Sequence, residues 1–354
     1  GAAVDALLPP LATVDLAAAK RITAPAAPKE AWAVKADPAP KPAKPLNRRG
    51  LALKATAGEL ITMAWAPSDK GIAAVLSGPG GPWAAKANAD TGGMPRHVER
   101  IDTAAGRTLG QVDVPAVYDL AALSPDGARL LLVTAQGRDR LDVFQAADAK
   151  PVVGWRPAPG KAIAWAEFLA DDRVLTLDAA GTLTLWSLPE AKPVYIAEAI
   201  GPQGRPVLSP GRAMVVVFGE KQARFLDPTN GTALGSVALP SLDPVTAAAF
   251  RADGGELAAI CGSELLRWDL IKKGASLPPA PAPLTQKIER LFYADNDHLV
   301  LADHWLYNLP NGRVSWIFKN GMVAPTSPDG ALWYAASATN IGQTFLKAGG
   351  KDNG

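Results

Sequence analysis

The sequence predicts an all-β fold built from repeats, on two observations. A strand–turn–strand unit, clearest in Leu123–Val133 (LSPDGARLLLV), returns along the chain with a mostly apolar residue before each turn. Successive pre-turn residues are 58, 45, 40, 42, 42 and 34 positions apart, and they are Trp65, Leu123, Phe168, Leu208, Phe250, Phe292 and Thr326. Four of these six spacings lie near the ~40–45 residues of a four-stranded propeller blade. We therefore expect a seven-bladed β-propeller of four-stranded blades over residues 50–347.

Each element of the unit has a physical reason. Asp and Gly follow the pre-turn residue because they tolerate the positive φ angles of tight hairpins. A second apolar strand comes next, as in Leu130–Thr134 and Ala213–Phe218. A third strand ends with a bulky residue, followed in most repeats by a polar turn; these residues are Ile101, Phe144, Trp186, Leu226, Trp268, Tyr307 and Phe345.

Two of these third strands give the chain a resemblance to the WD-repeat family of β-propellers. Trp268-Asp269 in LLRWDLIKKG matches the family's signature dipeptide, and Trp186 in LTLWSL matches half of it. The resemblance covers about residues 60–347. The family often places a histidine in a buried Asp–His–Ser–Trp network, but His97, His298 and His304 do not occupy that position. The resemblance therefore implies a divergent propeller whose rigidity comes from packing.

Strand counting predicts how the ring closes. The last repeat has room for three strands of its own, including Leu332–Ser337 and Ile341–Lys347, before the polar tail 348–354. Gly50–Thr56 is positioned to supply the missing outer strand, and the family resemblance implies the same N-terminal lock. Because closure removes exposed sheet edges, we expect deletion of residues 1–58 to destabilise the domain and deletion of 1–45 to leave it stable.

Residues 1–49 form an Ala/Pro-rich basic arm or linker, because proline removes amide donors and favours extended chain. Within it, Leu11–Arg21 is compatible with a short helix and Ala31–Lys35 with an edge strand. Trp32 is the arm's large aromatic residue and its expected anchor. The basic residues that follow are either a solvated linker or an electrostatic latch for an acidic partner or the domain's own acidic face; they include Lys41, Lys44, Arg48 and Arg49.

The long first spacing contains an insertion, Ser77–Pro95, between the second and third strands of the first repeat. Its glycines predict a mobile loop, and Trp83 and Met94 are residue types that anchor interfaces. The family resemblance implies that this connection opens on a face used for partners. The insertion is therefore either a binding loop or a tolerated insertion that places Trp83 on its own blade.

Several classes of function are disfavoured. The formal charge of +2 argues against a general nucleic-acid binder, and the single cysteine, Cys261, excludes an internal disulfide. No apolar run approaches the ~18 residues of a membrane helix. Asp295–His298 breaks off too early for a calcium loop, and no nucleophile elbow or phosphate loop occurs. We predict no catalytic residues, no metal site and no cofactor.

The sequence thus favours a non-catalytic protein-interaction or structural scaffold within a multi-subunit complex, and the chain is not expected to be an enzyme. Two alternatives stay open. One is a propeller enzyme or small-ligand binder that uses the central channel, and the other is a sensor or carrier domain of a longer protein. The alanine and proline bias suggests a bacterium with a GC-rich genome, and the arm would suit an envelope or extracytoplasmic protein.

Overall fold

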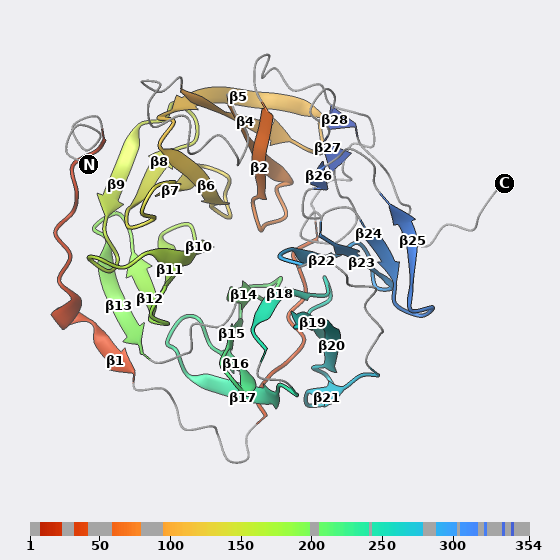
Figure 1. Cartoon of the computed structure of the whole chain (residues 1–354). Helices are drawn as coiled ribbons and strands as arrows, with labels where there is room; N and C mark the ends of the chain where they lie inside the picture. Colours follow the sequence, from red (N-terminus) through yellow and green to blue (C-terminus); the bar gives the residue numbers. More distant parts are fainter. Residues whose placement is uncertain are drawn as a thin grey trace.

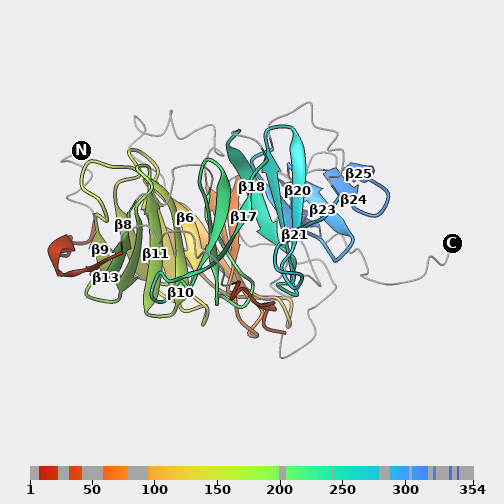
Figure 2. The ribbon, with the colours of Figure 1, turned by 90° about the horizontal axis from the view of Figure 1, so that it is seen from below.

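The computed structural model describes most of the chain; the described residues are 8–22, 32–41, 59–78, 95–198, 205–240, 243–278, 288–302, 305–317 and the pairs 322–323, 335–336 and 341–342. They form an all-β propeller in which small antiparallel sheets surround a centre (Figure 1). Seen from below, the sheets stand side by side in one layer (Figure 2). No helix in these ranges is long and apolar enough to cross a membrane.

The strands of each blade follow one another from the centre outward. The first three blades contain β2 (Glu59–Trp65), β3 (Ile72–Gly78), β4 (Arg96–Asp102), β5 (Arg107–Val114); β6 (Tyr118–Leu123), β7 (Arg129–Thr134), β8 (Leu141–Gln145), β9 (Pro151–Trp155); and β10 (Ile163–Ala170), β11 (Arg173–Asp178), β12 (Leu183–Ser187), β13 (Lys192–Ala197).

The next three blades follow the same plan. They contain β14 (Val207–Leu208), β15 (Val215–Phe218), β16 (Gln222–Leu226), β17 (Ala233–Ala238); β18 (Val245–Phe250), β19 (Glu256–Cys261), β20 (Glu264–Asp269), β21 (Ala275–Ser276); and β22 (Leu291–Tyr293), β23 (His298–Leu301), β24 (Trp305–Asn308), β25 (Arg313–Ile317). Every predicted pre-turn residue from Trp65 to Phe292 lies at or near the end of an inner strand, so the repeat unit is confirmed for these six blades.

The expectation of seven four-stranded blades is wrong, whereas closure by an N-terminal strand stays a prediction. The propeller has six blades of four strands, and the residues described beyond them form three two-residue strands, β26 (Met322–Val323), β27 (Ala335–Ala336) and β28 (Ile341–Gly342). The last repeat is the shortest, and within the described ranges no N-terminal strand pairs with this small sheet. Gly50–Thr56 lies outside the described residues.

The middle strands explain why the blades pack into a ring. β7, β15 and β19 are apolar at nearly every position, and almost all of their residues are buried. A strand buried on both faces reads as a continuous apolar run, because each face packs on a neighbouring blade. Outer strands such as β5 alternate between exposed and covered positions. The five larger apolar clusters accordingly lie between consecutive blades, and a small sixth one lies within blade 6.

Residues 8–22 of the N-terminal arm run along the outside of this ring, and residues 32–41 run from the outer edge inward between blades 4 and 5 (Figure 1). Ala12 N–H donates to Gly154 O at the edge of β9, over 2.7 Å. Further along, β1 (Lys20–Ile22) pairs in parallel with β13 and extends blade 3 to five strands. Ala33 N–H then donates to Leu234 O on β17, also over 2.7 Å. The arm therefore adds to the outer edges of blades 2, 3 and 4 in turn.

Apolar side chains of the arm enter the grooves between blades. Leu8 packs on the cluster between blades 1 and 2, Leu16 on the next cluster and Ile22 on the one between blades 3 and 4. Residues 11–16 alternate between exposed and half-buried, as an extended segment on a surface does. The helix expected at Leu11–Arg21 is therefore wrong: only a single 3-10 turn, η1 (Leu16–Ala18), interrupts the extended chain.

Trp32 anchors the next part of the arm between blades 4 and 5. Its ring meets Phe225 edge-on, with centroids 5.7 Å apart, and its Nε1–H donates to Leu270 O over 3.2 Å. Gly274 leaves room for this indole: a Cβ at Gly274 would lie 2.6 Å from Trp32 Cη2. Val34, two residues on, is buried in the same cluster. Of the edge strand expected at Ala31–Lys35, the described residues 32–35 contact a blade edge without forming a regular strand.

These contacts reverse the expectation for truncation. Deleting residues 1–45 is now expected to lower the melting temperature, because it uncovers four inter-blade grooves and three strand edges. Trp32→Ala alone is expected to cost about 2–3 kcal/mol in urea unfolding, somewhat below the ~3–5 kcal/mol of a fully buried aromatic residue. Trp316→Ala, on an indole that is 63% exposed, is the matched control and should change stability by less than about 0.5 kcal/mol. Equal losses would contradict the docking of the arm.

Candidate functional site

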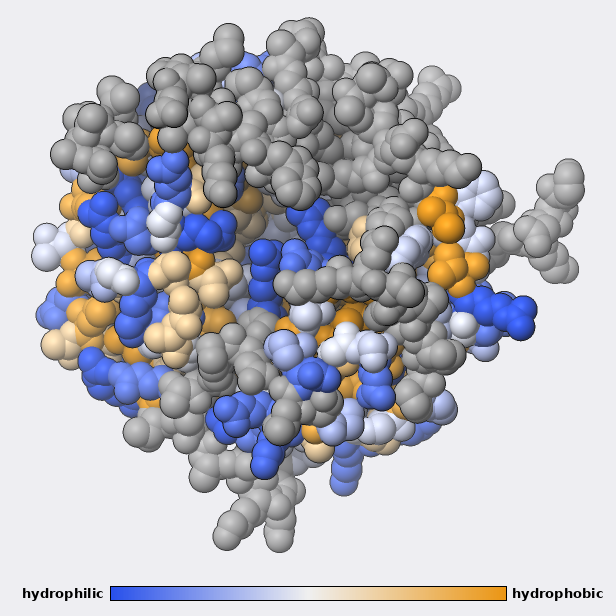
Figure 3. All heavy atoms as spheres, viewed as in Figure 1, coloured by the Kyte–Doolittle hydropathy of each residue, from blue (hydrophilic) through white to orange (hydrophobic). Residues whose placement is uncertain are grey.

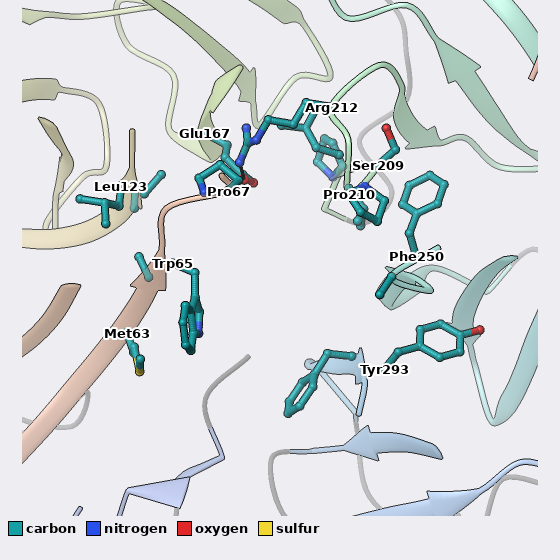
Figure 4. Close-up of a pocket in the computed structure, with 18 residues that line it drawn as sticks. Met63, Trp65, Pro67, Leu123, Glu167, Ser209, Pro210, Arg212, Phe250 and Tyr293 are labelled. Carbon is teal, nitrogen blue, oxygen red and sulfur yellow. Dashed lines mark hydrogen bonds and ion pairs between the residues drawn. The ribbon is translucent and has the colours of Figure 1, made fainter. Parts of the chain in front are cut away.

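The centre of the ring holds a cavity of about 390 Å³ at the point where the inner strands end (Figure 4). Each of the six blades contributes to its lining; one residue from each, in order, is Trp65, Leu123, Glu167, Arg212, Phe250 and Tyr293. These positions are the pre-turn residues of the repeat or their close neighbours. The repeat therefore brings six equivalent strand ends to one opening, which we call the channel mouth.

The channel mouth is mainly apolar and aromatic, with one internal ion pair. Arg212 Nη2 donates to Glu167 Oε1 over 2.7 Å, and the Arg212 side chain is only 12% exposed. Tyr293 O–H donates to the buried Glu256 rather than to the cavity, over 2.8 Å. Burial and the neighbouring Glu256 charge raise the pKa of Tyr293 well above its usual value. Glu167 thus pairs with Arg212 Nη2, whereas Arg212 Nε and Nη1 are buried without a hydrogen-bond partner. Among the described lining residues we find no nucleophile and base arranged for catalysis.

Turns that follow the inner strands border the channel mouth, and in blade 2 the turn holds a carboxylate. Asp126 Oδ1 accepts from Ser124 Oγ over 2.6 Å and from Ala128 N over 2.8 Å. Burial raises the pKa of Asp126, but the hydrogen bonds from Ser124 and Ala128 and the charge of Lys70 outweigh burial and lower it overall. Asp171 of blade 3 accepts from Asp126 N over 2.8 Å and links neighbouring turns.

The turn of blade 4 receives its carboxylate from elsewhere in the chain. Its sequence, Ser209-Pro210-Gly211-Arg212, lacks the aspartate of the blade 2 turn. Asp37 of the arm fills the gap, because it accepts from Ser209 Oγ over 2.5 Å and from Ala213 N over 2.8 Å. The sequence analysis missed Asp37. The signals available were the aspartate absent from LSPGRA and an isolated acid in an Ala/Pro-rich arm.

Three arginines lie at the opposite ends of the inner strands. Arg205 lies two residues before β14, Arg290 directly precedes β22, and Arg138 O accepts from Ile163 N at the start of β10. Partial desolvation and the like charges of Arg138 and Arg290 lower the pKa of the exposed Arg205, against the opposing charge of Glu289. We call Arg138, Arg205 and Arg290 the arginine cluster. Figure 3 shows hydrophilic residues gathered around the centre of the ring on the face in view.

The predicted interaction residues have different positions. Trp32 is docked on the propeller itself, and Lys41 is exposed where the described part of the arm ends. The insertion lies between β3 and β4, as the sequence predicted. The other predicted residues fall outside the described ranges, and their role stays a prediction; they are Lys44, Arg48, Arg49, Trp83 and Met94.

The acidic stretch Asp295–His298 belongs to a hairpin turn. His298 Nδ1 lies 2.9 Å from Asp295 Oδ1, and its Nε2 lies 2.9 Å from Asn308 Nδ2. Within the ranges that the structure describes, no three His, Cys, Asp or Glu residues gather as a metal site would require.

Comparison with known proteins adds no family to this geometry. The sequence matches no protein-family model, and a search of curated proteins gives no significant match. The β-propeller architecture therefore rests on the strand topology itself.

The Asp126 carboxylate gives a pH prediction. Because the folded-state pKa of Asp126 is lowered, its contribution is fully present above the unfolded pKa near 3.8 and is lost as pH falls below that value. Asp126→Asn should cost at most about 1 kcal/mol at pH 7, since the site is partly exposed. Melting temperatures measured from pH 7 to pH 2.5 should converge for the two proteins at the acid end. A constant difference across that range would contradict this role of Asp126.

Proposed function

We propose that this protein is a non-catalytic interaction scaffold, a propeller whose rim binds extended segments of partner proteins in a larger assembly. The observation that carries the proposal is the way the rim holds its own arm. Backbone hydrogen bonds along outer strands and apolar side chains in the grooves between blades are how sheet edges recognise extended peptides. A rim that binds one such segment in this manner is suited to bind others.

The outer strand β25 of blade 6 is the part of the rim that we assign to a partner. Trp316 and Ile317 are 63% and 53% exposed there, whereas tryptophan and isoleucine are usually covered. Among the described residues of the arm, none packs on this strand. The proposed occupant is an extended apolar segment of a partner protein, bound at the strand edge as β1 is bound to β13.

The test is purification of the tagged full chain from its native source under mild conditions. We expect a protein retained in a fixed ratio, and Trp316→Arg should reduce its recovery by about 10-fold, as loss of an aromatic anchor does. Ile271→Arg is the control, because Ile271 is equally prominent at 68% exposure but lies in a turn of blade 5. Unchanged recovery with Trp316→Arg, or no retained protein at all, would contradict the proposal.

Kinship with WD-repeat propellers belongs to the same proposal. Trp186 Nε1–H donates to Thr176 Oγ1 over 2.9 Å in the interior of blade 3. This bond resembles the Ser–Trp part of the network implied by that family, and Trp268 closes β20 at the signature dipeptide. Both features support a divergent relative of the family, with packing replacing the histidine.

The arginine cluster favours a second candidate, a small anionic ligand in the central channel. Arg138 and Arg290 lie close enough to lower the pKa of Arg205 although the Glu289 charge opposes them, and three neighbouring guanidinium groups create a positive potential that attracts anions. This candidate requires no catalytic group.

Citrate provides a direct probe of the second candidate. We expect 5–10 mM citrate (roughly the range for weak anion sites) to raise the melting temperature of the wild-type chain. Arg138→Ala/Arg205→Ala should abolish that rise, whereas Arg107→Ala on the exposed outer strand β5 should keep it. Equal citrate effects on all three proteins would contradict a channel site.

A further inference from the structure

We infer that the groove between blades 4 and 5 is a peptide-binding site, and that arm residues 32–41 are its internal, displaceable occupant. The partner that fits the site is an extended protein segment with an aromatic residue, a branched aliphatic residue two positions later and an aspartate three positions beyond that. Trp32, Val34 and Asp37 have this spacing in the arm. The inference rests on the proposed interaction role and names a site and a partner chemistry for it.

The carboxylate half of the site is a turn that lacks its own acid. In blade 2, Asp126 accepts from Ser124 Oγ and Ala128 N, and Arg129 N donates to Ser124 Oγ over 2.9 Å. Blade 4 has the same serine, and Met214 N donates to Ser209 Oγ over 2.8 Å. The two remaining donors, Ser209 Oγ and Ala213 N, both turn to Asp37 Oδ2. Asp37 thus reproduces the blade 2 hydrogen bonds from a different part of the chain.

Gly211 shows that the Asp37 carboxylate occupies the space that a side chain at position 211 would need. Gly211 stands at the sequence position of Asp126, and a Cβ built on it would lie 2.1 Å from Asp37 Oδ1. An aspartate at Gly211 and the Asp37 carboxylate therefore exclude each other. Gly211 N–H also donates to Asp37 O over 3.2 Å, so the turn binds both the backbone and the side chain of this residue.

The apolar half of the site contacts alternate residues of the arm before Asp37, namely Trp32 and Val34. Trp32 meets Phe225 and Val34 is buried, whereas Ala33, Lys35 and Ala36 are exposed. Beyond the aspartate, Ala39 N–H donates to Ala252 O in the blade 5 turn over 2.8 Å. The site therefore recognises three side chains and an extended backbone, and it ignores the outward-facing positions.

The occupant is displaceable because its contacts with the groove come from one short segment. They include three backbone hydrogen bonds, the hydrogen bond from Trp32 Nε1–H to Leu270 O, one carboxylate and two apolar side chains. A tethered segment has an effective concentration on the order of millimolar, so a partner competes once its own affinity or contact length exceeds that advantage.

Exchange of Gly211 for aspartate tests the carboxylate site in the full-length chain. Gly211→Asp should place a carboxylate in the turn, expel Asp37 and raise amide hydrogen exchange of residues 32–41 by at least ~10-fold. Asp37→Ala should raise exchange in both 32–41 and 209–214. Asp37→Ala/Gly211→Asp should restore protection to 209–214 alone. Lys35→Ala, an exposed position in the same segment, is the control and should change neither.

A labelled peptide with the sequence of residues 31–41 (AWAVKADPAPK) then tests whether a separate segment can bind in the groove in place of the arm. We expect fluorescence anisotropy to show binding to the full chain carrying Trp32→Ala/Asp37→Ala. The Asp-to-Ala form of the peptide should bind about 10-fold more weakly, the usual effect of losing a charged hydrogen-bonding partner. Adding Gly211→Asp to the host should weaken binding of the unaltered peptide to a similar extent.

Unchanged exchange of residues 32–41 in Gly211→Asp, equal affinity for the two peptides, or absence of peptide binding would overturn the inference. These results are distinguishable from failure of the scaffold proposal. A partner lost specifically with Trp316→Arg would still support the scaffold while this groove is rejected.

Discussion

The structure depends on the need of each blade to bury both faces of its middle strands. A sheet with strands such as Leu130–Leu132 or Val215–Phe218 is apolar on two sides, so it is stable only between two neighbours. This constraint orders the blades around a centre and places the apolar clusters between them. Because contacts between blades supply the rigidity, the propeller can do without a buried histidine network, and individual turns are free to vary.

The outer edges create the opposite constraint. Packing between blades leaves the fourth strand of each blade with unpaired backbone groups, and such edges invite further strands. The arm occupies three of these edges, and proline keeps it extended and poor in amide donors of its own. Edge pairing and groove filling coincide at Trp32, Val34 and Asp37, where side chains of the arm complete both a core and a turn.

The channel mouth is linked to the groove between blades 4 and 5 through one turn. Ser209 binds the arm carboxylate, while Arg212 of the same turn lines the central cavity and pairs with Glu167. Arg212 has φ near +67°, where blade 2 has Gly127, so the turn keeps a left-handed residue that is unfavourable for a side chain. The hydrogen bonds from Ser209 and Ala213 to Asp37 help to hold that conformation. Occupancy of the groove between blades 4 and 5 and the geometry of the cavity wall are thereby physically connected.

The sequence by itself determined the blade unit, because strand, turn and strand are local patterns. Trp65, Leu123 and Phe250 end inner strands as predicted, and the insertion falls in the predicted connection. Only the tertiary structure decided the number of four-stranded blades and the path of the arm. Both depend on which edge an extended segment finds, and parallel pairing of Lys20–Ile22 with β13 leaves no local pattern. The same holds for Asp37, whose partner Ser209 is 172 residues away, since a carboxylate supplied from a distance is visible in sequence only as an aspartate absent from its turn.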